Sequence, residues 1–525
     1  MRDLTATKIV ATVGPASSTK EKLKELYNAG VTMFRLNSSH GSQEEHLQRI
    51  HAIREIEEET GHPIPILLDL QGPKIRVGIL EEPIELLKDS VIKLRHQSEY
   101  KDGIIPVDYE GIAKDAVVGE KIFIDDGKLV LQVEKTEDDV VYAKVLCGGL
   151  LKQRKGINIP GSQGSLKVLT ARDLEFVKFA IDNELDYLGL SFVRNVEDVM
   201  ELRNVIKQNN GKIKIISKIE KPQALDNIDE IIMRSAGIMV ARGDLGIEIS
   251  PEKVPIVQKE LIRKANAQRK VVIVATQMLE SMTEQPIPTR AEASDVANAI
   301  LDGTDAIMLS GETAAGKYPI EAVKMMQSIA RNVENSDLIR HDFYPQDLVD
   351  CCKDDSIAIC TAIIDMIEKV NVKAVLALTA SGYTPKLLSK AKPSVPVISF
   401  CPSARNTRRL VLFSDVFPLR INLTETFSKE TLIDIENILK KKFHYKNGDK
   451  IILTGAIPDI MVGKTNFIKL HEIGNWYERF FWIQRANQQM LQVWTLYVCL
   501  PSLWVDRKWL CKRKREVCYA WGSFK

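Results

Sequence analysis

The sequence predicts an α/β protein built on a (β/α)8 TIM barrel, with an inserted all-β domain and a C-terminal open-sheet α/β domain. Two observations indicate the barrel: eight short apolar segments alternate with helical patterns, and most of these segments end in polar side chains. A third observation indicates the insertion, because the alternation is interrupted by short runs with a period near two and Gly-Pro punctuation. The length of 525 residues fits about three domains.

The expected barrel strands share an apolar character on both faces, as strands covered by helices do. They are residues 8–13, 31–36, 64–68, 187–193, 213–219, 237–241, 271–276 and 306–310. The inserted domain has β-like runs at 104–107, 121–124, 129–133 and 140–145. The last block has strands expected at 373–378, 395–400, 416–421, 450–454 and 467–472. These patterns give a barrel of residues 1–70 and 170–345, an insert of residues 71–169, an α/β domain of residues 346–473 and a tail of residues 474–525.

Composition narrows the class of protein. Hydrophobic residues make up 45% and charged residues 27%, which is typical of a globular domain, and the net charge of +2 argues against nucleic acid or an acidic membrane as the main partner. No stretch approaches about 18 consecutive apolar residues. The chain enters a strand within a few residues of its start, so we expect no signal peptide. The eight cysteines lack zinc-site spacing, and we expect reduced thiols in a cytoplasmic protein.

The tail differs in composition from the rest of the chain. All six tryptophans lie between residues 476 and 521, and residues 475–525 hold nine Lys and Arg against three Asp and Glu. No helical or strand period is evident there. Two explanations stay open: a lineage-specific segment, or the product of a shifted reading frame.

Polar residues at the strand ends indicate the chemistry, because barrel enzymes place their active sites at the C-terminal ends of the strands. The residues expected at this mouth are Arg35, Asn37, Asp69, Lys218, Glu220, Asp244, Thr276, Ser310 and Glu312. Glu220 and Asp244 are two carboxylates that follow neighbouring strands and suit one hard divalent cation, Mg²⁺ or Mn²⁺. Lys218 and Arg35 add positive charge, so the mouth suits an anionic substrate that carries phosphate.

Two features of the mouth have a plainer alternative. Lys218 and Glu220 alternate on one strand, so they could form a solvated ion pair. Gly243 could allow a ligand close to the backbone, or it could serve a tight turn. Arg242 is expected to pair with structure around the site. His46 and His51 lie in a charged helical pattern, and we expect them at the surface.

The sequence resembles the pyruvate kinase family, of the bacterial type. The matching stretches are FRLNSSHG (34–41), LDLQGPKIR (68–76), ISKIE (216–220), GIMVARGDLG (237–246), ATQMLESM (275–282), PTRAEASDVANA (288–299) and MLSGETA (308–314). They cover the whole barrel, and a less specific match continues to about residue 473.

The resemblance implies phosphoryl transfer from phosphoenolpyruvate to ADP, giving pyruvate and ATP, as in the last step of glycolysis. It implies that Lys218, Arg35, Thr276 and Ser310 are catalytic and that Glu220 and Asp244 bind Mg²⁺. Substrate contacts would come from Arg35, Lys218, Gly243, Asp244 and Thr276. Nucleotide contacts would come from Asn37, Ser38, Ser39, His40, Arg76 and Lys155. The inserted domain would close over the cleft as a lid.

One departure from the family pattern concerns a monovalent cation. Asn37, Ser39, Asp69 and Leu70 match positions that bind K⁺ in many members, but Lys74 stands where those members have glutamate. An ammonium group can replace a monovalent cation, so we predict activity without K⁺. Two further departures are Ala236, where an aspartate is usual, and Arg269, where a glycine is usual.

The C-terminal α/β domain carries a possible effector loop. Thr379, Ser381, Gly382 and Thr384 resemble the family's phosphate loop for a sugar phosphate or nucleotide, and small hydroxyl residues before a helix suit phosphate. An ordinary strand-to-helix turn is the alternative. The family also implies a homotetramer.

Two other functions stay open at this point. The chain could be another barrel enzyme acting on phosphoenolpyruvate or a related oxoacid, although the insert with Lys155 argues for a nucleotide site. It could instead be an inactive regulatory protein that binds phosphometabolites, although the intact Lys218, Glu220, Asp244 and Thr276 argue against this.

Overall fold

The computed structural model describes residues 5–160, 166–336, 355–421, 429–455 and 465–475. Apart from its first two residues, the tail expected from residue 474 lies outside this part. The chain divides into two compact units, and the barrel, the inserted domain and most of the C-terminal sheet belong to the first.

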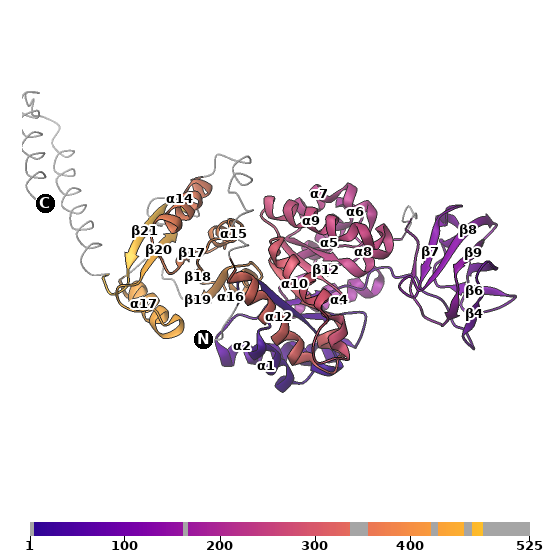
Figure 1. The fold of residues 1–525 in the computed structure, drawn as a ribbon, viewed down its shortest axis with the longest axis horizontal. Helices are drawn as coiled ribbons and strands as arrows, with labels where there is room; N and C mark the ends of the chain where they lie inside the picture. The colour runs from indigo at the N-terminus through magenta and orange to yellow at the C-terminus, as the bar shows by residue number, and fades with distance from the viewer. Residues whose placement is uncertain (1–4, 161–165, 337–354, 422–428, 456–464, 476–525) are drawn as a thin grey trace, which may run out of the picture. The chain divides into compact units, whose positions relative to one another are not determined.

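Eight parallel strands close into a barrel, which confirms the predicted fold (Figure 1). Their order around the barrel is β1-β16-β15-β14-β13-β12-β3-β2. Their bounds are Lys8–Val13 (β1), Met33–Asn37 (β2), Ile66–Asp69 (β3), Tyr187–Leu190 (β12), Lys214–Ile219 (β13), Gly237–Ala241 (β14), Val271–Ala275 (β15) and Ala306–Leu309 (β16). The strands end within a few residues of the expected positions, and β12 to β16 follow the insert as predicted.

Helices cover the barrel. The longer ones are α1 (Lys20–Ala29), α2 (Gln43–Thr60), α4 (Ala171–Asp182), α5 (Val196–Gln208), α7 (Ile228–Arg234), α9 (Val254–Ala267), α10 (Arg290–Leu301) and α12 (Pro319–Glu334). Of these, α1, α2, α4, α5 and α10 begin at a polar side chain that caps the first turn. Ser42 and Glu45 form a reciprocal capping box at α2, and Gly61 ends that helix in the left-handed region at φ 63°.

One expectation for α2 was wrong. His46 is fully buried, not at the surface. Its Nε2 atom lies 2.9 Å from the His40 carbonyl oxygen, and its ring packs edge-on against Phe176. Burial and the nearby cation Arg49 lower the pKa of His46, so its neutral form is favoured. His51 is exposed as expected.

The inserted domain is all β and has its own apolar core. Its six-stranded sheet has the order β11-β7-β8-β9-β5-β6, and β10 pairs with β4. The bounds are Ile84–Leu86 (β4), Val91–His96 (β5), Ile104–Val107 (β6), Lys121–Ile124 (β7), Leu129–Glu137 (β8), Val140–Cys147 (β9), Gly149–Leu151 (β10) and Ile157–Asn158 (β11). The four expected runs are strands β6 to β9. The other four strands escaped prediction because three of them have two or three residues and β5 is largely exposed.

The C-terminal domain contains an open five-stranded sheet in the order β19-β18-β17-β20-β21, as predicted. Its strands are Val375–Leu378 (β17), Val397–Cys401 (β18), Val416–Arg420 (β19), Lys450–Gly455 (β20) and Phe467–Glu472 (β21). Its helices are α14 (Asp355–Lys369), α15 (Tyr383–Lys390), α16 (Ala404–Leu410) and α17 (Lys429–Phe443).

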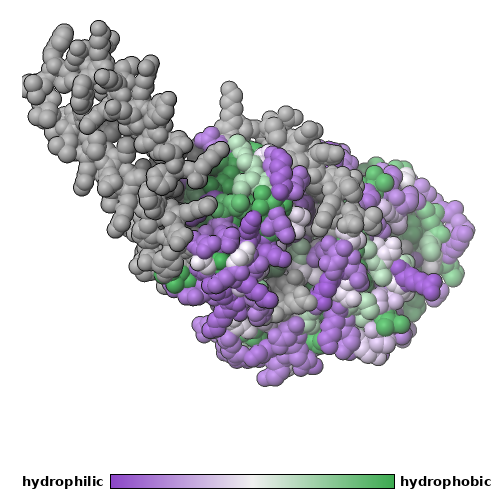
Figure 2. All heavy atoms as spheres, turned by 60° about the vertical axis from the view of Figure 1, so that its left-hand side comes forward, coloured by the Kyte–Doolittle hydropathy of each residue, from purple (hydrophilic) through white to green (hydrophobic). Residues whose placement is uncertain are grey.

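The described surface shown in Figure 2 is mainly hydrophilic, with small hydrophobic areas scattered between the charged ones. Among the described helices, none has both the length and the apolar character to cross a membrane. Cys147, Cys360 and Cys401 form no disulfide with one another.

Candidate active site

The C-terminal ends of β2, β3 and β13 bring a network of charged side chains together. Arg35 lies on β2, Asp69 ends β3 and Lys218 lies on β13. The Arg35 Nε and Nη2 atoms lie 2.8 and 2.6 Å from Asp69 Oδ2. The Lys218 ammonium lies 3.4 Å from the other oxygen, Asp69 Oδ1, as an ion pair without a directed hydrogen bond. Asp69 therefore holds both basic side chains that the sequence assigned to phosphate.

Burial makes this network electrostatically strong. The Asp69 side chain is 1% exposed, and those of Arg35 and Lys218 are 12% exposed. Burial alone would raise the pKa of Asp69, but Lys218 and Arg35 outweigh it and hold that pKa below its ordinary value. Burial opposes the charge of Lys218, yet the carboxylates of Asp69 and Glu220 raise its pKa above the ordinary value. Lys218 is therefore a cation across the physiological pH range.

Glu220 follows β13 and completes the network. Its Oε1 atom lies 2.8 Å from the Lys218 ammonium, and its Oε2 atom accepts a 2.7 Å hydrogen bond from the Phe192 backbone. The predicted Lys218–Glu220 contact is real, but Glu220 is 1% exposed, so the pair is not the solvated one considered above. Burial raises the pKa of Glu220; Lys218 lowers it and the like charge of Asp244 raises it.

Asp244 lies in the first turn of α8 (Arg242–Ile249), the helix that follows β14. Its negative charge raises the pKa of Glu220, so the two carboxylates lie close enough to repel each other. A divalent cation between them would relieve that repulsion, so the donor set fits the expected Mg²⁺. In the described chain, no group of three or more His, Cys, Asp and Glu side chains is arranged to hold a metal. A two-carboxylate site leaves the other coordination positions to water and substrate, as Mg²⁺ prefers.

Gly243 and Thr276 meet at the ends of β14 and β15. The Gly243 backbone N–H donates a 2.8 Å hydrogen bond to Thr276 Oγ1, and that hydroxyl donates to the Ala275 carbonyl at 2.6 Å. Thr276 has a φ of 68° and Gln277 a φ of 53°, which is the left-handed region that β-branched residues avoid. Two of the expected substrate contacts, Gly243 and Thr276, are therefore hydrogen-bonded to each other, and Thr276 sits in a strained turn.

Arg242 holds this turn, as the sequence analysis expected. Its Nη1 atom lies 2.7 Å from Asp295 Oδ1, and its Nη2 atom donates to the carbonyls of Thr276 (2.8 Å) and Gln277 (3.1 Å). An arginine suits this task because its planar fork can bind a carboxylate and backbone carbonyls together.

Ser310 follows β16 and begins the short helix α11 (Gly311–Ala314). Its backbone N–H donates a 2.7 Å hydrogen bond to Glu312 Oε2, and Glu312 is fully buried. The Ser310 hydroxyl is buried and makes no hydrogen bond within the described chain. A buried hydroxyl of this kind can give or take a proton when a ligand or water arrives.

A cleft of 1410 Å³ lies beside these residues. Gly243, Asp244, Thr276 and Ser310 line it on the barrel side. Lys121, Phe123, Asp126 and Gly127 of the inserted domain line it on the other side. These inserted-domain residues were not predicted, since nothing in their local sequence distinguishes them from other hairpin residues.

The expected nucleotide residues fall into two groups. Asn37 ends β2 and Ser38 to His40 form the loop after it, in which the Ser38 hydroxyl donates a 2.8 Å hydrogen bond to the Asp69 carbonyl. Arg76 and Lys155 lie at the start and end of the inserted domain, and the Lys155 ammonium pairs with Asp125 Oδ1 at 2.8 Å. Four of the six expected residues therefore lie at the end of β2 or directly after it, and two lie on the inserted domain.

The positions expected for a monovalent cation have partners within the chain. Asn37 Oδ1 accepts from the Ser39 backbone at 3.1 Å, and the Leu70 carbonyl accepts from the Ser191 hydroxyl at 2.7 Å. Lys74 is exposed, and it shares a small pocket of 60 Å³ with Asp244. Within the described chain it makes no hydrogen bond or ion pair to Asp69, whose partners are Arg35 and Lys218.

The expected effector loop leads into α15. Gly382 has a φ of 81°, and its N–H donates a 2.8 Å hydrogen bond to Thr379 Oγ1. The Ser381 hydroxyl accepts from the Tyr383 backbone at 3.3 Å, and the hydroxyls of Thr384 and Thr465 are in contact. The glycine is required here, because a side chain would be strained at this φ and would approach Leu410 to 3.0 Å.

Two further site residues, both on the barrel, were not predicted. Ser191 follows β12 and accepts a 2.8 Å hydrogen bond from the Lys218 ammonium. Thr12 lies on β1 and accepts from Arg35 Nη1 at 3.0 Å. Both lie at strand ends, so the reasoning used for the other strands would have found them.

The fold and the site together define a class of protein: a (β/α)8-barrel enzyme whose mouth combines paired basic side chains with two carboxylates, Glu220 and Asp244. Comparison with known proteins is more specific. Residues 4–323 match the family model described as "Pyruvate kinase, barrel domain", and residues 357–471 match "Pyruvate kinase, alpha/beta domain".

Curated relatives agree with these matches. The pyruvate kinase of Staphylococcus haemolyticus (strain JCSC1435) is 42% identical over 483 residues, which cover 89% of this chain and 80% of that protein. Those of Sporosarcina psychrophila (42% over 481 residues) and Staphylococcus aureus strain MRSA252 (41% over 488 residues) have the same coverage. The chain belongs to the pyruvate kinase family and is a phosphotransferase.

Proposed function

We propose that this enzyme transfers a phosphoryl group from phosphoenolpyruvate to ADP, giving pyruvate and ATP. The proposal rests on the buried network at the mouth of the barrel. In this network, Asp69 and Glu220 form ion pairs that hold the Lys218 and Arg35 side chains close together. Phosphoryl transfer needs charge neutralisation and positioning more than a protein nucleophile, and a fixed pair of cations supplies both.

In the proposed reaction Arg35 binds the phosphate of phosphoenolpyruvate. Lys218 stabilises the phosphoryl group in transit and the enolate that remains. Its raised pKa suits this role, because an ammonium that keeps its proton stabilises developing negative charge throughout.

The substrate carboxylate would bind to the backbone at Gly243 and Asp244 and to the Thr276 hydroxyl. For this to happen, the Thr276 hydroxyl turns its proton from the Ala275 carbonyl to the ligand. Ser310 supports the proposed proton delivery to the enolate, because its hydroxyl is buried, lies beside the same cleft and has no hydrogen-bond partner in the described chain.

Glu220 and Asp244 would hold the divalent cation, with Mg²⁺ or Mn²⁺ as the candidates. When bound, such an ion neutralises phosphate charge and orients the phosphate oxygens. Glu220→Gln and Asp244→Asn should each weaken Mg²⁺ binding measured by isothermal titration. Unchanged Mg²⁺ affinity in both variants would contradict this assignment.

Nucleotide binding is proposed for Asn37, Ser38, Ser39, His40, Arg76 and Lys155, with the inserted domain closing as a lid. Closure would have to release Lys155 from Asp125 for the ammonium to reach the nucleotide. The pocket that Lys74 shares with Asp244 supports activity without K⁺, since it puts an ammonium group near one of the expected metal carboxylates. Strong activation of the purified enzyme by K⁺ would refute that part.

Regulation is a further part of the proposal. The loop with Thr379, Ser381, Gly382 and Thr384 is proposed to bind the phosphate of an effector, and the enzyme is proposed to be a homotetramer. Sedimentation would test the assembly. Thr384→Ala would test the loop through loss of effector activation.

The decisive test is a coupled assay of ADP-dependent pyruvate formation with wild-type enzyme and the Lys218→Met variant. We expect pyruvate formation that requires ADP and falls by several orders of magnitude in the variant. Pyruvate formation without ADP would instead favour another enzyme acting on phosphoenolpyruvate, and no activity in the wild type would favour an inactive binding protein. Unchanged activity in Lys218→Met would overturn the role given to Lys218.

A further inference from the structure

A cluster of basic side chains lies at the opposite end of the barrel from the active site, where β13 and β15 begin. Four of its members lie on helices or strands, and the fifth lies in the segment before β15. They are Arg203 (α5), Lys214 (β13), Lys270 (before β15), Lys386 (α15) and Arg409 (α16). We call this group the basic cluster.

Backbone pairing places the first members of the basic cluster. Ala236 precedes β14, where its N–H donates to the Ile215 carbonyl at 2.9 Å and its carbonyl accepts from Val271. Lys214 and Lys270 therefore begin strands on either side of Ala236, with backbones about 10 Å apart, which is two strand spacings.

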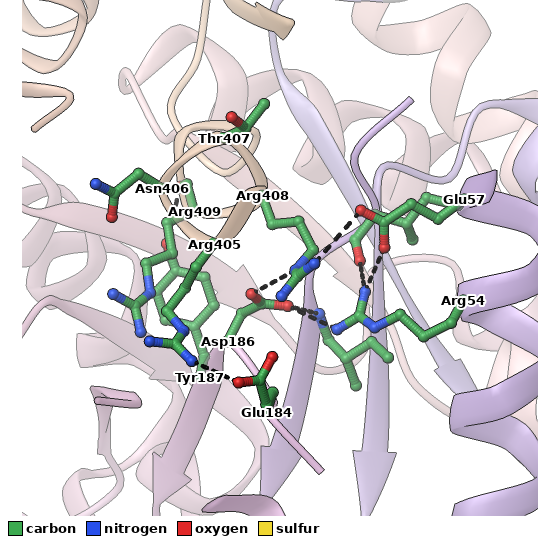
Figure 3. A network of polar contacts seen from close by, with 12 residues as sticks. Arg54, Glu57, Glu184, Asp186, Tyr187, Arg405, Asn406, Thr407, Arg408 and Arg409 are labelled. Atoms are coloured by element: carbon green, nitrogen blue, oxygen red, sulfur yellow. Dashed lines mark hydrogen bonds and ion pairs between the residues drawn. The ribbon is translucent and has the colours of Figure 1, made fainter. Parts of the chain in front are cut away.

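The C-terminal domain adds the other members. The Tyr187 hydroxyl donates a 2.9 Å hydrogen bond to the Arg409 carbonyl, and Tyr187 pairs with Lys214 in the barrel. Figure 3 shows the Arg409 side chain beside Tyr187, whereas Arg408 turns towards Asp186. The Lys386 ammonium lies 5.5 Å from the centre of the Phe413 ring.

The positive charges of the basic cluster are not balanced by acidic side chains. No carboxylate of the described chain forms an ion pair with any of the five residues. Arg203, Lys270 and Arg409 donate to backbone carbonyls instead. Asp186, whose charge acts on the pKa of Arg409, is already held by Arg54 and Arg408.

The pKa shifts within the basic cluster agree with this lack of balancing carboxylates, because its positive charges lower one another's pKa. Burial lowers the pKa of Lys270, and Arg203 and Lys214 lower it further. Burial also lowers the pKa of Lys386 to about 8, with Lys214, Arg409 and Lys270 acting in the same direction. In addition, the Arg409 Nε atom is buried without a hydrogen-bond partner in the described chain.

The sequence explains why the basic cluster has no carboxylate that balances its positive charge. Ala236 stands between Lys214 and Lys270, at the position where the family pattern has an aspartate. An aspartate there would place a carboxylate between the two strands that carry these lysines. Arg203 and Lys214 are exposed, so an anion from solution can reach the cluster.

We propose that the basic cluster is a second anion-binding site, for a small molecule that carries a phosphate or pyrophosphate group. Arginine and lysine together suit such a group, because the guanidinium forms paired hydrogen bonds and the ammonium supplies a point charge. The site lies at the other end of the barrel from the catalytic cleft, and its member Lys386 follows the loop at Gly382 by one turn of α15. Its presence does not depend on the proposed reaction.

Titration calorimetry with inorganic pyrophosphate, in buffer containing EDTA, tests the proposal. We expect binding to wild-type enzyme that persists in Lys218→Met, which alters the cleft, and in Thr384→Ala, which alters the effector loop. Ala236→Asp should weaken this binding by about tenfold or more, because it adds a carboxylate to the site. Ala236→Asn is the matched control, and its affinity should stay within about twofold of wild type.

Two results with the variants would overturn the proposal: equal pyrophosphate affinity in wild type and Ala236→Asp, or loss of all binding in Lys218→Met or Thr384→Ala. Absence of binding to wild type would do the same. Ala236→Asp should also raise the melting temperature without pyrophosphate, because it relieves repulsion. If that variant does not fold, Lys386→Gln provides the second test, with the same expected loss of affinity.

Discussion

Two buried aspartates offer a matched test of how the active site is held. Asp69 lies at the mouth of the barrel between Arg35 and Lys218, and Asp186 lies at the other end between Arg54 and Arg408 (Figure 3). Each carboxylate binds two basic side chains. Asp69→Asn and Asp186→Asn therefore remove the same charge from equivalent surroundings.

The structure sets the expected loss of stability. Asp69 is 1% exposed and Asp186 is fully buried. Removing one partner of a buried ion pair costs about 3–5 kcal/mol, because the remaining charge is left unbalanced. The asparagine oxygen can still accept one hydrogen bond, so we expect about 3 kcal/mol for each variant. Unfolding in urea measures this value.

Activity should separate the two variants. In Asp69→Asn the side chains of Arg35 and Lys218 lose their common anchor, and a displacement of about 1 Å at the reacting groups costs about 100-fold in rate. We expect kcat/KM for phosphoenolpyruvate to fall by about that factor. Asp186→Asn should stay within about twofold of wild type, because its partners lie far from the cleft.

The outcome is measured in the coupled pyruvate assay at a temperature where both variants are folded. An Asp69→Asn enzyme with wild-type kcat/KM would refute the idea that Asp69 positions Arg35 and Lys218 for the reaction. Equal losses in both variants would show that the activity reports stability alone.

Three further predictions follow from the described residues. Arg269 has a φ of 60°, so Arg269→Gly should stabilise the protein by about 1 kcal/mol in urea unfolding, and a loss of stability would contradict this. The pKa of Lys386 is lowered from 10.5 to about 8 in the folded protein, so between pH 8 and pH 10.5 the unfolded chain binds more protons than the folded one. The free energy of unfolding should therefore rise with pH in this range, by at most about 3 kcal/mol, and Lys386→Gln should remove that rise. Arg242→Lys should lower kcat/KM by about 10- to 100-fold, because a lysine cannot hold both Asp295 and the Thr276 carbonyl; wild-type kinetics would exclude this role.

Much of the site could be predicted because the fold imposes it locally. In a barrel of parallel strands, whatever follows an apolar strand lies at the mouth, so Arg35, Asp69, Lys218 and Glu220 were found from sequence position alone. The same rule could have found Ser191.

Other features depend on neighbours that are distant in the chain. The charged pattern of its helix predicts that His46 lies at the surface, but Phe176 of α4 packs against its ring and helps to bury it. The strained Thr276 turn depends on Arg242, 34 residues earlier. The basic cluster draws on residues as far apart as Arg203 and Arg409, so no local pattern marks it.

The sequence by itself determined the barrel, the insert, the C-terminal sheet and most of the charged groups at the mouth, since these follow from apolar period and strand order. Only the tertiary structure decided which groups are paired. It assigned Asp69 to Arg35 and Lys218, turned Lys155 towards Asp125, and left the basic cluster without a carboxylate. The physical reason is that ion pairing depends on distances of a few ångströms between side chains, and sequence order does not specify those distances.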